Sequence, residues 1–166
     1  MSELQLLAMI RSDYIVNVQF AFQDRNTLYL VMDLLLGGDL RYHIARKRKF
    51  SEEITKFFVA CLLHALDSVH SCSIIHRDIK PENLVFDNDG YLRLTDFGVA
   101  KICTPENANE TSGTPGYMAP EVMCRQNHGL VSDYFAVGVI AFECMMGRRP
   151  YIGKSRREIR EHILTR

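Results

Sequence analysis

The sequence predicts an α+β fold, with β-hairpins in a chain that is mainly helical after residue 36. Apolar and polar side chains alternate over residues 14–22, which is the period of a half-buried strand. Asp-Asn-Asp-Gly at 87–90 separates two apolar runs, a pattern typical of a β-hairpin. Apolar residues recur at helical spacing over 54–69, and residues 131–146 are almost entirely apolar. We therefore expect one globular domain with a small sheet-forming part and a larger helical part.

The N-terminal elements are expected to be a short helix and a hairpin. Apolar residues three positions apart predict a helix that begins at or before residue 1. Residues 14–22 then form the first strand, and the turn residues at 24–26 lead into a buried apolar strand at 28–32.

Two helices should follow this hairpin. Consecutive glycines break the chain, and Asp39 is placed to cap a helix that runs through Ile44. Ser51 starts the clearest helix of the chain, because a capping side chain is followed by two glutamates in the first turn. Apolar residues continue at helical spacing as far as Val69.

The C-terminal part combines a long loop with two further helices. Residues 99–130 show no sustained periodicity and predict a long functional loop. The apolar stretch 131–146 predicts a buried helix, with Gly147 at its C-terminal cap. Ser155 and Glu158 have the spacing of a capping box at the start of a last helix.

The composition excludes several classes of partner and location. The net charge is zero, with 20 basic and 20 acidic residues, so we expect no nucleic-acid or anionic-membrane partner. The basic run at 46–49 is best explained as a solvated helix end. The apolar stretch 131–146 is too short for a transmembrane segment, and no signal peptide is visible. Five cysteines without a C-x-x-C pair indicate reduced thiols and a cytoplasmic location.

Three short motifs carry the functional information. The first is the run His76-Arg77-Asp78-Ile79-Lys80-Pro81-Glu82-Asn83, the second is Asp-Phe-Gly at 96–98, and the third is Ala-Pro-Glu at 119–121. Any tripeptide alone is a weak signal, but this order and spacing are specific. The chain resembles the catalytic domain of a serine/threonine protein kinase. The resemblance implies a protein-kinase-like fold that comprises mostly the helical C-lobe, with a remnant of the N-lobe.

The resemblance implies a role for four polar side chains. Asp78 corresponds to the catalytic base that accepts the proton of the acceptor hydroxyl. Asn83 and Asp96 correspond to the ligands of Mg²⁺, an ion that prefers oxygen donors. Lys80 corresponds to the group that meets the γ-phosphate of ATP. Taken singly, Asp78 and Asp96 are better explained as turn caps and Asn83 as part of an Asx turn. The register of all four residues favours the functional interpretation.

The resemblance also assigns residues to the nucleotide pocket. Met32 corresponds to the residue that guards the pocket, and the hinge comprises Asp33, Leu34 and Leu35. Val85 corresponds to the floor of the adenine site. For Met32 and Val85, an ordinary core position is the alternative.

The acceptor is expected to be a serine or threonine of a protein substrate. Lys80 together with Thr114 is the serine/threonine pattern of the family. Asp39 and Glu82 match positions at which basophilic members hold substrate arginines, so we expect basic residues that flank the acceptor. The alternative is that both are solvated surface acids. The run from Leu34 to His43 is most similar to the AGC group, with its YANK-type subgroup as the finer assignment.

Further residues correspond to structural and regulatory positions. Glu3 matches the glutamate of helix C. Leu7, Val18, His76 and Phe97 match an apolar stack between the lobes, and Asp133 matches an anchor for the catalytic-loop backbone.

The loop at 99–130 should be partly ordered by its own charge. Glu110 is expected to pair with Arg77 and to supply some of the order that a phosphate gives. Thr111 and Ser112 remain candidates for phosphorylation by an upstream activating kinase.

The resemblance divides the chain into a remnant of the N-lobe at 1–35 and a C-lobe, without its last helices, at 36–166. No G-x-G-x-x-G loop is present, and the first lysine is Lys47. Two explanations stay open: a piece of a longer kinase, or a short non-catalytic relative that acts as a binding or scaffold module. In either case we expect the 166 residues alone to have little kinase activity.

Overall fold

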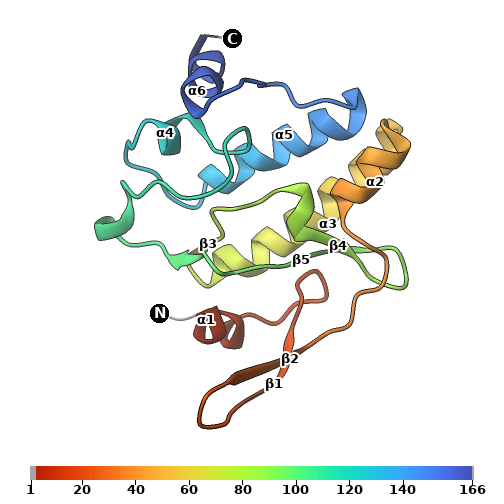
Figure 1. The fold of residues 1–166 in the computed structure, drawn as a ribbon, viewed down its shortest axis with the longest axis vertical. Helices are drawn as coiled ribbons and strands as arrows, with labels where there is room; N and C mark the ends of the chain where they lie inside the picture. The colour runs from red at the N-terminus through yellow and green to blue at the C-terminus, as the bar shows by residue number, and fades with distance from the viewer. Residues whose placement is uncertain (1–2, 166) are drawn as a thin grey trace.

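A computed structural model of the chain describes residues 3–165, apart from the side chain of Asn107. It confirms the α+β class, with helices as the larger part (Figure 1). The elements are, in order, α1 (Glu3–Met9), β1 (Val18–Gln23), β2 (Leu28–Met32), α2 (Leu40–Lys47), α3 (Glu52–Ser71), β3 (Ile74–Ile75), η1 (Pro81–Asn83), β4 (Leu84–Phe86), β5 (Leu92–Leu94), β6 (Lys101–Ile102), η2 (Pro105–Asn107), α4 (Pro120–Met123), α5 (Ser132–Met146) and α6 (Arg156–Thr165).

The described strands form three antiparallel pairs: β1 with β2, β3 with β6, and β4 with β5. In the third pair Leu84 lies opposite Leu94, which confirms the hairpin expected around residues 87–90. Its Gly90 has a φ of 88°, a conformation that glycine adopts without strain. This hairpin leads from η1 to the Asp-Phe-Gly motif at 96–98 and so connects two of the sequence motifs.

Helices α3 and α5 run side by side through the centre of the helical body (Figure 1). Their inner faces are buried and share one hydrophobic core with α1 and β5. Ser51 caps α3 as expected, because its hydroxyl accepts a hydrogen bond from the backbone nitrogen of Ile54 at 3.3 Å. Asp39 caps α2 in the same way through Tyr42 at 2.7 Å, and α2 runs to Lys47, beyond the expected end at Ile44.

The apolar stretch 131–146 forms α5 and is buried on most of its surface. Gly147 ends it with a φ of 71°, as expected for a C-terminal cap. Tyr134, Met145 and Met146 remain exposed. The prediction of a buried helix is therefore confirmed for the face that packs on α3.

The β1–β2 hairpin is present, but the burial expected for it is wrong. Phe20 is 69 % exposed and Leu28 is 54 % exposed. A two-stranded sheet has two faces, and within residues 3–165 α1 contacts it near Val18 and leaves the rest open. Phe22 and Tyr29 pack on each other instead, with ring centroids 5.0 Å apart. The alternation of apolar residues identified the strand but not the presence of a covering layer.

Two smaller expectations also need correction. The capping box of α6 is only half formed: Ser155 accepts from the nitrogen of Glu158 at 3.2 Å, whereas the Glu158 carboxylate accepts from Lys154 at 2.8 Å rather than from Ser155. The loop at 99–130 contains regular elements, namely β6, η2 and α4, although most of it is irregular.

Candidate active site

The backbone that carries the His-Arg-Asp sequence is fixed by one buried carboxylate. Asp133, at the start of α5, accepts hydrogen bonds from the backbone nitrogens of His76 at 2.9 Å and Arg77 at 3.0 Å. It also contacts Nε2 of His70 at 2.8 Å. Asp133 is 3 % exposed, and these donors satisfy a carboxylate that would be costly to bury without partners. The expected anchoring role of Asp133 is confirmed.

His76 is fully buried and holds the next turn of the loop. Its Nε2 faces the carbonyl oxygen of Thr95 at 3.1 Å, and its Nδ1 faces the backbone nitrogen of Asp78 at 3.4 Å. These partners favour the neutral ring with the proton on Nε2. Burial lowers the pKa of His76 in the same direction. The ring packs edge-on against Phe97 with centroids 4.9 Å apart, which confirms the predicted packing role of both residues.

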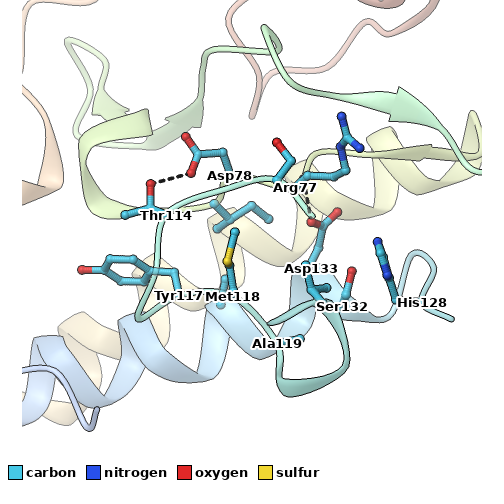
Figure 2. Close-up of a pocket in the computed structure, with 13 residues that line it drawn as sticks. Arg77, Asp78, Thr114, Tyr117, Met118, Ala119, His128, Ser132 and Asp133 are labelled. Carbon is cyan, nitrogen blue, oxygen red and sulfur yellow. Dashed lines mark hydrogen bonds between the residues drawn. The ribbon is translucent and has the colours of Figure 1, made fainter. Parts of the chain in front are cut away.

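Both carboxylate oxygens of Asp78 have a partner in the structure. Lys80 Nζ lies 2.6 Å from Oδ2. Thr114 Oγ1 lies 2.7 Å from Oδ1 (Figure 2). The lysine also contacts Thr114 at 3.2 Å. Although burial alone would raise it, these hydrogen bonds lower the pKa of Asp78. An ionised carboxylate is therefore held in place between the catalytic loop and the segment that contains Thr114.

The β4–β5 hairpin brings the two expected metal ligands to the same end of a strand pair. Asn83 precedes β4, and Asp96 comes two residues after β5. The backbone nitrogen of Thr95 donates to the carbonyl of Asn83 at 2.9 Å, so the two strands stay paired up to this point. Asp96 has a φ of 62° and an exposed side chain whose Oδ1 accepts from Gly98 at 3.1 Å.

The donor set at this point fits a magnesium ion. The amide nitrogen of Asn83 donates to the carbonyl oxygen of Asp78 at 2.9 Å, which leaves the amide oxygen to face a cation. The exposed carboxylate of Asp96, at the same end of the hairpin, would supply a second oxygen. Mg²⁺ is commonly held by one or two protein oxygens and keeps several waters, so a larger cluster is not required. Within the described residues, no group of three or more His, Cys, Asp or Glu side chains has the geometry of a metal site.

A small cavity lies behind the catalytic loop. Its volume is about 20 Å³, which is room for about one water molecule. Figure 2 shows the loop residues Arg77 and Asp78 on one side and Met118 and Ala119 on the other. The cavity marks the place where the catalytic loop packs against the segment after Gly113.

The residues expected to bind adenine are only partly brought together. Asp33 and Leu35 line one pocket of about 250 Å³ with Arg93 and the β4–β5 turn. Met32 and Val85 are not among its lining residues, and Met32 is 37 % exposed. Asp33 accepts from Asn17 at 3.0 Å and from Gln19 at 2.6 Å, so the hinge is tied to the strand-forming part. The adenine site stays a prediction.

Glu3 lies close to the Asp-Phe-Gly motif. Its carboxylate accepts a hydrogen bond from the backbone nitrogen of Phe97 at 3.2 Å. Leu7 and Phe97 are buried in the same hydrophobic core, and Val18 packs against it. The sequence-based stack of these residues with His76 is compatible with this arrangement.

The loop at 99–130, the activation segment, is joined to the catalytic loop by an ion pair that the sequence predicted. Glu110 lies 2.8 Å from Nη1 of Arg77 and 2.6 Å from Nζ of Lys101. Hydrogen bonds from Lys101 and Arg77 lower the pKa of Glu110. Gly113, three residues later, has a φ of 110°, and a Cβ there would meet the carbonyl oxygen of Arg77 at 2.3 Å. Only glycine allows the segment to approach the catalytic loop so closely.

Sequence reasoning missed a network around Arg41. This α2 residue donates to Glu82 at 2.8 Å, to Glu143 at 2.8 and 3.2 Å, and to the hydroxyl of Tyr117. Tyr117 in turn donates to Glu143 at 2.5 Å. A glutamate inside the apolar stretch 131–146 was the available signal, since a buried carboxylate requires a partner. Glu82 therefore has an internal partner in the structure.

The comparisons with known proteins agree with this geometry. Residues 1–166 match the protein kinase domain family. The chain is 40% identical to a probable serine/threonine-protein kinase of Dictyostelium discoideum, over 99% of this chain and 37% of the relative. It is 42% identical to ribosomal protein S6 kinase 2 beta of Xenopus laevis and to ribosomal protein S6 kinase alpha-1 of Homo sapiens. Each of these two matches covers 98% of this chain.

The chain spans between 22% and 37% of the length of these three relatives. None of the described helices is long and apolar enough to cross a membrane. The family match extends over all 166 residues, and the relatives are serine/threonine kinases with names that fit the AGC-like assignment. With its His-Arg-Asp loop anchored by Asp133 and its Asp-Phe-Gly motif beside it, the chain belongs to the protein kinase family.

Proposed function

We propose that this chain is the part of a serine/threonine protein kinase that transfers the γ-phosphoryl group of ATP to a protein hydroxyl. The observation that carries the proposal is the convergence of Lys80 and Thr114 on the Asp78 carboxylate. An ionised acid held at this point accepts a hydrogen bond from an incoming hydroxyl and takes its proton as the phosphoryl group is transferred.

The other residues position the reactants. Lys80 donates to Asp78 and Thr114 in the resting site and offers its remaining N–H group to a phosphate oxygen. Asn83 and Asp96 would hold Mg²⁺, which supplies positive charge at the phosphates when bound. Met32, Asp33, Leu35 and Val85 are proposed to contact the nucleotide base, as the resemblance implies.

Phosphorylation by the complete gene product that carries residues 1–166 tests the proposal. We expect Mg²⁺-dependent transfer from ATP to a serine or threonine protein substrate. Asp78→Asn should lower kcat by about 10²–10⁴-fold, the usual contribution of a general base. Asp96→Asn should mainly weaken Mg²⁺–nucleotide binding. Asp67→Asn, at an exposed position of α3, is the matched control.

Two outcomes would contradict the proposal. Near-normal turnover in folded Asp78→Asn protein would remove the base from the mechanism. No transfer by the unaltered protein to any substrate would favour the non-catalytic binding module. The same assay on the 166 residues alone tests the expectation that they have little activity by themselves.

We further propose an intracellular enzyme that an upstream kinase activates at Thr111 or Ser112. The five cysteines are all free, which supports a reducing compartment. Basic flanks of the acceptor were expected from Asp39 and Glu82, and this stays a prediction. The internal partner of Glu82, Arg41, argues against selection of arginine by this residue.

A further inference from the structure

The guanidinium of Arg41 binds two carboxylates, those of Glu82 and Glu143, beside the proposed acceptor site. Its Nε donates to Glu82, and its two terminal nitrogens donate to Glu143. Glu82 comes two residues after Lys80, and Tyr117 comes three residues after Thr114, so both flank groups that contact Asp78. Figure 2 shows Tyr117 further along the same segment as Thr114. An acceptor chain that reaches Asp78 must therefore pass close to this network.

The carboxylates of this network receive hydrogen bonds from within the protein and need no donor from a substrate. Glu143 is 4 % exposed, and both of its oxygens accept hydrogen bonds, from Arg41 and from Tyr117. Burial opposes it, but the hydrogen bonds with Glu143 and Glu82 raise the pKa of Arg41, so the guanidinium stays charged. A planar guanidinium held by two carboxylates is the same arrangement that a substrate arginine would make.

The charge around the network is also balanced. Arg149 lies over the ring of Tyr117, with 5.8 Å from its guanidinium carbon to the ring centroid. Arg149 forms no ion pair among residues 3–165. With Arg149 included, the network has two cationic and two acidic side chains, so their formal charges cancel. A neutral patch has no net attraction for an additional arginine.

We propose that Arg41 is a specificity-determining residue. Its guanidinium already binds the carboxylates of Glu82 and Glu143, so this site does not select acceptor peptides for arginine. The proposal rests on the proposed kinase function. Removal of the Arg41 guanidinium exposes two carboxylates at the acceptor site and creates a preference for a basic residue.

The test compares peptide pairs that differ in one residue, arginine or alanine, at each position that flanks a serine. The complete gene product is assayed as the unaltered protein, as Arg41→Gln and as Arg46→Gln. Arg46 lies on the same helix and contacts Tyr42, so its change is the matched control. Two quantities are measured: peptide affinity by fluorescence anisotropy, and kcat/KM with Mg²⁺ and ATP.

At the position where Arg41→Gln gains selectivity, we expect the unaltered protein and Arg46→Gln to treat both peptides alike. Arg41→Gln should prefer the arginine peptide at one position by roughly tenfold or more in affinity. A purely structural role for Arg41 would lower overall activity without changing this ratio. An unchanged ratio in folded Arg41→Gln protein would therefore overturn the proposal.

A second variant keeps the test decisive if Arg41→Gln does not fold. Glu82→Gln in the otherwise unaltered protein should leave the arginine-to-alanine ratio unchanged, because Glu82 is already occupied. A roughly tenfold preference for arginine in the unaltered protein that Glu82→Gln removes would refute the proposal and support basic flanks. If no peptide is phosphorylated by any variant, the kinase function fails, and the affinity ratios still decide the role of Arg41.

Discussion

Arg77, the residue directly before the proposed catalytic base, is joined to Glu110 of the activation segment by an ion pair of 2.8 Å. The side chain of Arg77 is 8% exposed, whereas that of Glu110 is 42% exposed. An acid supplied by the segment itself thus neutralises a nearly buried cation at the active site. We expect this contact to provide part of the order that a phosphate would otherwise supply.

We expect Glu110→Gln to lower kcat in the complete gene product, because Arg77 and Lys101 lose their shared carboxylate. The effect should shrink at high salt, since Glu110 is solvent-accessible and its ion pairs are screened. Steady-state kinetics at low and high ionic strength measure it, with Glu106→Gln as the control in the same segment. If Glu110→Ala left activity unchanged while Thr111→Ala abolished it, ordering by Glu110 would be wrong.

Thr114 should control the position of the Asp78 carboxylate. Thr114→Val removes the hydrogen bond at 2.7 Å, and a hydrogen bond to a charged group contributes about 1.5–3 kcal/mol. The free energy of unfolding should fall by that order, and the pKa of Asp78 should rise toward its ordinary value of 3.8. Urea denaturation and NMR titration measure the two effects. Thr114→Ser keeps the hydroxyl and should restore both.

Among the carboxylates, we expect substitution of Asp133 to lower the free energy of unfolding the most. Asp133→Asn keeps one acceptor oxygen but places an amide N–H₂ either opposite the donor of Arg77 or opposite those of His76 and His70. The free energy of unfolding should fall by roughly 3 kcal/mol, the upper end for a hydrogen bond to a buried charged group. Asp67→Asn, on the exposed face of α3, should change it by less than about 0.5 kcal/mol. Equal effects of the two changes would contradict the anchoring role.

The buried imidazole of His76 makes stability depend on pH. Burial lowers its pKa below the ordinary 6.5, so as the pH falls through 6.5 the unfolded chain binds a proton that the folded chain does not. This contribution to stability is present above that pH and is lost below it, with a slope of up to about 1.4 kcal/mol per pH unit. Urea denaturation between about pH 7.5 and 5.5 measures it.

The corresponding control uses two histidine substitutions. His76→Gln should remove much of this pH dependence, although it destabilises the core. His64→Gln, at an exposed position stacked on Tyr14, should leave the slope unchanged. A pH dependence that is identical in His76→Gln and the unaltered protein would contradict the role of the buried ring.

The sequence predicted local features well because their causes are local. The caps at Asp39, Ser51 and Gly147 each act within one helical turn, and residue type is enough to identify them. The catalytic loop was identified by a contiguous motif. Its anchoring by Asp133, 57 positions away from His76, was predicted only because the resemblance linked them.

Contacts between distant parts of the chain explain what the sequence did not predict. Arg41 is separated by 41 positions from Glu82 and by 102 positions from Glu143, and no motif connects the three. Alternation over residues 14–22 indicates which side chains share a face of the strand. Whether another layer covers that face depends on the rest of the fold, so the exposure of Phe20 could not be predicted.

The open faces of the β1–β2 hairpin affect how the chain unfolds. A two-stranded sheet with little burial is marginally stable in water, whereas α3 and α5 open only when the central core opens. Backbone amides of Phe20 and Val31 should therefore exchange with deuterated solvent through local fraying, long before those of Leu66 and Ile140. Cooperative two-state unfolding then applies to the helical body and not to the hairpin. A single melting temperature describes the part of the chain that holds the catalytic loop, and the hairpin has a lower stability of its own.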